Sequence, residues 1–131
     1  MRLENTTKIV ICLAVTAFAL CIADMATTYV AVSNGAQELN PVVAKDITSY
    51  GLSTALLLAM VVPIFASTFS VGGSMVINRT LNQEVGLSIS ERSNIKRCVT
   101  LGLSGIITVV IALRLFAVVN NLSELLRVGI I

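Results

Sequence analysis

The segment Ile9–Val32, IVICLAVTAFALCIADMATTYVAV, decides the fold of this chain. Asp24 is its only charged residue, and an apolar helix of about 20 residues crosses a hydrocarbon core roughly 30 Å thick. Two further stretches have this length and character, Tyr50–Ile77 and Cys98–Val119, and the first of them has no charge at all. The sequence therefore predicts an all-α integral membrane protein with three transmembrane helices.

The overall composition agrees with a membrane location. Of 131 residues, 56% are hydrophobic and only 12% are charged, which is unlike the usual composition of soluble domains. The apolar runs are continuous rather than alternating, and this pattern favours helices over a β-barrel. We expect one membrane domain over residues 1–131, with loops at 33–49 and 78–97 and a short amphipathic segment after Val119.

The distribution of basic residues predicts how the chain is oriented in the membrane. With three spans, six basic residues fall on the side of the N-terminus: Arg2, Lys8, Arg79, Arg92, Lys96 and Arg97. The opposite side has two, Lys45 and Arg127. Because basic residues concentrate on the cytoplasmic side, we expect a multi-pass cell-membrane protein with a cytoplasmic N-terminus and an external C-terminus.

The loop 78–97 holds a capping-box pattern, Ser88-x-x-Glu91, which predicts a helix start before the third span. Arg92 and Lys96 follow it four residues apart, on one face of that helix. The basic cluster is small and lacks aromatic neighbours, so we interpret it as a contact to lipid headgroups rather than to nucleic acid.

Proline and glycine predict where the helices are interrupted. Pro41 disfavours helix at Asn40, which indicates a break at the outer surface. In the second span, Pro63 and the run Gly72–Ser74 predict a kink or a local break.

Two charges within the spans lie at matching depth. Asp24 lies 15 residues after Ile9, and Arg114 lies 15 residues after Val99. At about 1.5 Å per residue, both are roughly 22 Å from the inner edge of the membrane. A lone carboxylate near the bilayer centre costs about 2.5 to 3.5 kcal/mol, and a partner of opposite charge removes most of that cost. We therefore expect an intramembrane ion pair between Asp24 and Arg114.

Further polar residues are expected to extend this pair into a polar column. Thr27 and Thr28 follow Asp24 on the same helical face, and Asn121 lies two turns beyond Arg114. Glu38, Asn40 and Asn120 would complete the column on its outer side. The alternative is that these loop residues are only the hydrated ends of two helices.

Catalytic and metal-binding patterns are missing from the sequence. The chain has no histidine, and Cys12, Cys21 and Cys98 lack the spacing of metal ligands, so we interpret them as packing residues. One intramembrane aspartate is too few for an aspartyl protease, and a serine nucleophile would have no base. We expect no catalytic residue, no cofactor and no metal site.

The string Asp24-x-x-Thr27-Thr28, followed by Gly35-x-x-Glu38-x-Asn40-Pro41, resembles the signature of a family of small prokaryotic integral membrane proteins known only as a domain of unknown function. The stretch 117–121 is similar to the closing helix of that family. The resemblance covers most of the chain and implies no established activity. Family members often have a basic residue in the second span, which this chain lacks, and the difference weakens the case for a shared ion path through that helix.

Two functions remain open. Small residues spaced four apart allow close helix contacts in all three spans: Ala23/Thr27/Ala31, Ala55/Ala59, Ala66/Ser70/Ser74 and Ser104/Thr108/Ala112. These faces favour a non-catalytic accessory or structural subunit that packs with copies of itself or with other membrane subunits. The alternative is an oligomeric transporter of ions, protons or small solutes that uses Asp24 and Arg114.

Overall fold

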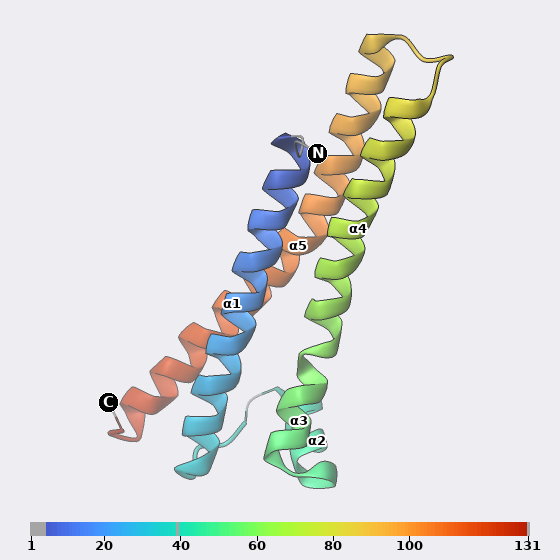
Figure 1. Ribbon diagram of the computed structural model, residues 1–131. Helices are drawn as coiled ribbons and strands as arrows, with labels where there is room; N and C mark the ends of the chain where they lie inside the picture. The colour runs from blue at the N-terminus through green and yellow to red at the C-terminus, as the bar shows by residue number, and fades with distance from the viewer. Residues whose placement is uncertain (1–4, 39, 131) are drawn as a thin grey trace.

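The structure, a computed structural model, describes residues 5–38 and 40–130, and within these ranges it is helical without strands. Arg2, counted above for the orientation, lies outside the described residues. The helices are α1 (Asn5–Ser33), α2 (Pro41–Tyr50), α3 (Leu52–Ala59), α4 (Val61–Gln83) and α5 (Ile89–Arg127) (Figure 1). Three segments are long and apolar enough to cross a membrane: Asn5–Ser33, Leu52–Gln83 and Ile89–Arg127. The all-α fold with three spans is confirmed.

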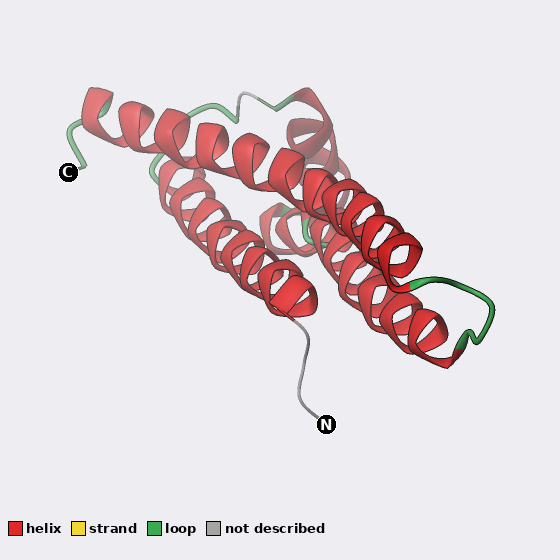
Figure 2. Cartoon of the chain, turned by 90° about the horizontal axis from the view of Figure 1, so that it is seen from above, coloured by secondary structure: helices red, strands yellow, loops and turns green. Residues whose placement is uncertain are grey.

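Helices α1, α4 and α5 form the bundle, and α1 packs most extensively against α5. α3 continues the line of α4, and α2 folds back against α3 at the end of the bundle far from the α4–α5 loop (Figures 1 and 2). The core is small: Val10, Ala17 and Ile107 are fully buried where the three long helices meet. Many large apolar side chains face outward instead, among them Phe65 and Phe116 at 70% and 74% exposure. Such a surface matches a lipid environment rather than water.

Helix α2 was not predicted, because residues 33–49 were expected to form a loop. The Asn40 side chain accepts a hydrogen bond from the Val42 N–H at 3.1 Å, and Pro41 occupies the first helical turn. An Asn cap followed by proline is a favourable helix start, because that proline has no N–H that needs a helical partner. The expected break at Asn40 is therefore present, but it is followed by a ten-residue helix. Gly51, at a φ of +82°, then joins α2 to α3.

The second span is interrupted between α3 and α4, at Met60. Pro63 lies three residues later, and its ring nitrogen has no hydrogen to donate to the carbonyl of Ala59, four residues before it. At Gly72–Ser74, where a kink or a local break was predicted, α4 continues without a break. A Cβ on Gly73 would lie 3.6 Å from the Leu103 side chain, so this glycine lies at the contact between α4 and α5.

The predicted capping box at the start of α5 is confirmed. The Ser88 hydroxyl accepts from the Glu91 N–H at 3.3 Å, and the Glu91 carboxylate accepts from the Ser88 N–H at 2.9 Å. Hydrogen bonds from the Ser88 side chain and backbone lower the pKa of the Glu91 carboxyl, which lies before the predicted span. The C-terminal amphipathic segment is helical and is the continuation of α5, which curves along its length and ends at Arg127 (Figure 2).

Candidate functional site

The two intramembrane charges meet inside the bundle. Arg114 Nη1 on α5 lies 2.5 Å from Asp24 Oδ2 on α1. Asp24 is buried, at 7% exposure, and the Arg114 side chain is 19% exposed. Each charge therefore provides the partner that offsets the cost of removing the other from water.

Arg114 also bonds to the interrupted second span. Its Nη2 donates to the carbonyl oxygen of Ala59 at 2.6 Å. This oxygen is the acceptor that Pro63 leaves without a helical donor, and an unpaired carbonyl in an apolar interior is costly. The planar guanidinium presents donors in two directions, so a single side chain connects α1, α3 and α5. Sequence reasoning missed this acceptor, although Pro63 four residues after Ala59 was the available signal.

Asn121, two turns beyond Arg114 on α5, completes the contact to α1. Its Nδ2 lies 2.7 Å from Thr28 Oγ1, 3.1 Å from Asp24 Oδ1 and 3.3 Å from Thr27 Oγ1. An amide nitrogen has two hydrogens, so these three acceptors share them. Both carboxylate oxygens of Asp24 thus accept a hydrogen bond from α5. We refer to Asp24, Thr27, Thr28, Arg114 and Asn121, together with the Ala59 carbonyl, as the polar clamp.

The outer part of the predicted polar column is arranged differently from the expectation. Glu38 Oε1 accepts from the Asn40 N–H at 2.7 Å, and the Asn40 side chain caps α2. Within the described residues, neither side chain bonds to Asp24 or Arg114. The reason is local: both residues precede a new helix start, where backbone N–H groups need acceptors. Glu38, Asn40 and Asn120 instead line a hollow beside the polar clamp.

This hollow, the clamp pocket, has a volume of about 610 Å³ and lies between α2, α3 and α4 on one side and α1 and α5 on the other. Its charged lining residues are Asp24, Glu38, Asp46 and Arg114. Most of the remaining wall is apolar, and it includes Val42, Leu58, Val62, Leu113 and Phe116. Asp46 was missed in the sequence, because the helix that carries it was not expected.

No family model, curated protein or solved structure matches this chain. The resemblance to a family of small prokaryotic membrane proteins therefore stays a prediction.

A second polar contact joins α1 to α4 near the other end of the bundle. The Thr7 and Ser74 hydroxyls lie 3.2 Å apart, and Asn78 Nδ2 donates to the Thr7 hydroxyl at 2.5 Å. Thr7 and Ser74 are both buried. From the sequence, Ser74 was expected in a small-residue packing face and in a possible helix interruption, so this hydrogen-bonded contact was missed.

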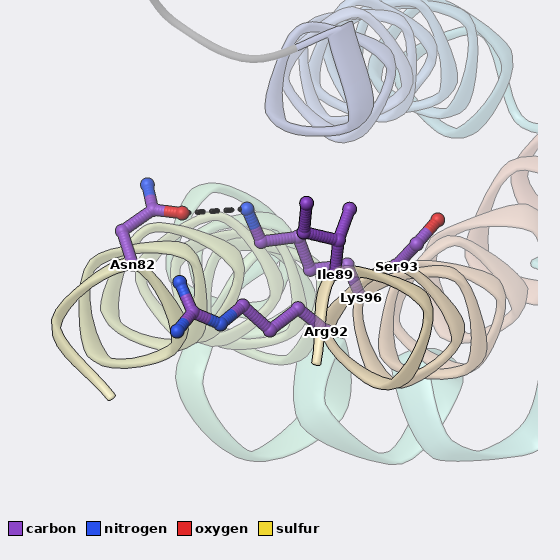
Figure 3. A pocket seen from close by; sticks show the side chains of 5 residues that line it. All are labelled: Asn82, Ile89, Arg92, Ser93 and Lys96. Carbon is purple, nitrogen blue, oxygen red and sulfur yellow. Dashed lines mark hydrogen bonds between the residues drawn. The ribbon is translucent and has the colours of Figure 1, made fainter. Parts of the chain in front are cut away.

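Two residues of the basic cluster bond to the end of α4. Lys96 Nζ donates to Asn82 Oδ1 at 2.8 Å, and both line a hollow of about 330 Å³ (Figure 3). Arg92, beside them, donates to the backbone carbonyl of Glu84. Cations are favourable at the C-terminal end of a helix, where carbonyl groups lack helical partners. Part of this cluster therefore fastens α5 to α4.

The remaining reactive groups are dispersed. Among the described residues, no three of the His, Cys, Asp and Glu type lie close enough to hold a metal ion. The three cysteines are unpaired, with Cys21 buried and Cys12 and Cys98 exposed.

Proposed function

We propose that this protein is a non-catalytic integral membrane subunit that packs against copies of itself or against other membrane proteins. The observation that carries the proposal is the double role of Arg114, which is bonded to Asp24 at 2.5 Å and to the Ala59 carbonyl at 2.6 Å. The intramembrane charges are thus engaged in holding three helices together. A guanidinium that is hydrogen-bonded on two sides is better suited to a structural role than to a chemical one.

The outer surface of α5 supports the lateral contacts that such a subunit needs. Gly105, Thr108 and Ala112 are all exposed there, and space is open beyond the Cα of Gly105. The Thr108 hydroxyl donates a hydrogen bond to the carbonyl oxygen of Ser104 at 2.8 Å. A neighbouring helix can approach such a face closely without burying an unpaired polar group.

Native mass spectrometry of the protein, extracted from its own membranes in mild detergent, tests the proposal. We expect a defined complex with further copies or with other membrane proteins. Gly105→Leu should weaken the complex, whereas Gly72→Leu, at an equally open position on α4, is the matched control. A protein that is recovered only as a monomer, also after cross-linking within the membrane, would count against the subunit role.

Transport is the second candidate, and the clamp pocket is the observation that favours it. A cavity of about 610 Å³ beside an intramembrane carboxylate offers a place for an ion or solute. Flux in liposomes that disappears with Asp24→Asn would support transport. Against transport, both carboxylate oxygens of Asp24 already accept hydrogen bonds from α5, one from Arg114 and one from Asn121.

We further propose the orientation that the basic residues predict, with the N-terminus and the α4–α5 loop in the cytoplasm and α2 outside. The basic residues support this orientation, because the start of α1, the end of α4 and the start of α5 carry five of them: Lys8, Arg79, Arg92, Lys96 and Arg97.

A further inference from the structure

The clamp pocket carries more negative than positive charge. Its lining includes three carboxylates, Asp24, Glu38 and Asp46, and one guanidinium, Arg114, so the formal balance is three minus one, or two negative charges in excess. Arg114 is already paired with Asp24. The excess therefore belongs to Glu38 and Asp46.

Neither of these carboxylates forms an ion pair within the part of the chain that the structure describes. Glu38 accepts one backbone hydrogen bond, from Asn40. Asp46 is half-buried, and its side chain makes no hydrogen bond or ion pair among residues 5–38 and 40–130. Lys45 is its neighbour in the chain, but Lys45 is exposed and does not line the pocket.

The rest of the pocket is suited to an apolar body. Side chains such as Leu58, Val62 and Phe116 form much of its wall, and its volume lies within the range of about 300 to 1,000 Å³ found for small-molecule sites. An anion would be repelled by the excess charge, and a small metal ion would lose water against apolar walls. A molecule that is both apolar and positively charged satisfies both parts of the lining.

We propose that the clamp pocket binds an amphipathic cation, with the charged centre toward Glu38 and Asp46 and the apolar part against α3, α4 and α5. The proposal is independent of the subunit role, because a monomer contains the whole pocket. Ligand binding and lateral assembly are therefore separate properties of the same chain.

Tetraphenylphosphonium and tetraphenylborate provide the test, since they share size and shape and differ in the sign of the charge. Equilibrium dialysis of the purified protein in a neutral detergent should show saturable binding of tetraphenylphosphonium, at least roughly tenfold tighter than that of tetraphenylborate. The partition of each probe into protein-free micelles is measured and subtracted, and it is the same for all variants of the protein.

Substitutions of the two carboxylates test whether tetraphenylphosphonium binds in the clamp pocket. Asp46→Asn and Glu38→Gln should each weaken tetraphenylphosphonium binding by roughly threefold to tenfold. Glu84→Gln removes one negative charge at the opposite end of the bundle and should leave binding unchanged. Circular dichroism checks that each variant is folded. If Glu38→Gln disturbs α2, the effect of Asp46→Asn on tetraphenylphosphonium binding is the result that tests the proposal. Equal binding of the two probes, no saturable binding, or equal weakening by Glu84→Gln would overturn the proposal.

Discussion

Arg114 donates a hydrogen bond to the carbonyl oxygen of Ala59, at 2.6 Å, where the second span is interrupted. Pro63 cannot make this bond, because it has no backbone N–H. A charged side chain on α5 therefore replaces a backbone donor that α4 lacks. The break at Met60 and the intramembrane arginine are parts of one arrangement, and α3 is held to the bundle through it.

Restoring the missing backbone donor should make Arg114 less important. In a Pro63→Ala background, residue 63 has an N–H directed toward Ala59. The loss of unfolding free energy caused by Arg114→Gln should then be smaller by about 0.5 to 1.5 kcal/mol, the usual net contribution of one hydrogen bond. Unfolding by SDS in mixed micelles measures this difference. An equal loss in both backgrounds would show that Arg114 does not serve as the substitute donor.

Asn121 and Asn120 are adjacent in sequence but differ in their contacts. Asn121→Ala leaves Thr28 and one oxygen of Asp24 without their donor, so we expect a loss of about 1 to 3 kcal/mol in unfolding free energy. Asn120 lines the clamp pocket, and its side chain has no hydrogen bond among the described residues, so Asn120→Ala should change stability by less than about 0.5 kcal/mol. Similar losses from the two variants would contradict this assignment.

Those contacts of the polar clamp that depend on helical geometry could be predicted from the sequence. Arg114 was expected beside Asp24 because the two lie at equal depth in their spans. Thr27 and Thr28 follow Asp24 by three and four residues, and Asn121 follows Arg114 by seven, so all three were expected near the pair. Such spacings are set by the rise and pitch of the helix and need no knowledge of packing.

The features that were missed depend on acceptors or elements that sequence patterns do not display. The Ala59 carbonyl has no side-chain signal, and only the proline four residues later marks it. Glu38 and Asn40 were expected to cap the ion pair, but they bond to nearby backbone at the start of α2. A ten-residue helix outside the spans gives only a weak periodic signal, so Asp46 was missed with it.

Two neighbouring threonines should respond to substitution with opposite signs. The Thr7 hydroxyl bonds to Ser74 and Asn78, so Thr7→Val should lower the unfolding free energy by about 1 to 2 kcal/mol. The Thr6 hydroxyl is buried without a partner among the described residues, so Thr6→Val should raise it by about 1 kcal/mol. Thermal unfolding in detergent distinguishes the two, and a shift in the same direction for both would contradict the contact between α1 and α4.

The proposed orientation predicts which loop is accessible from outside the cell. Gln37 and Val85 are exposed residues in the two loops, and Val85 is 93% exposed. With Cys12, Cys21 and Cys98 replaced by alanine, Gln37→Cys should react with a membrane-impermeant maleimide on intact cells, and Val85→Cys should react only after lysis. The reverse labelling pattern would show that the chain has the opposite orientation in the membrane.

A double-mutant cycle on Asp24 and Arg114 tests most directly the claim that the polar clamp holds the helices together. Asp24→Asn and Arg114→Gln should each lower the unfolding free energy by about 3 to 5 kcal/mol, because each leaves a buried charge without its partner. The double variant should lose less than the sum by about 1 to 3 kcal/mol, measured by SDS unfolding in mixed micelles. If the double variant instead loses the full sum of the two single losses, the two side chains are not energetically coupled and the clamp is wrong.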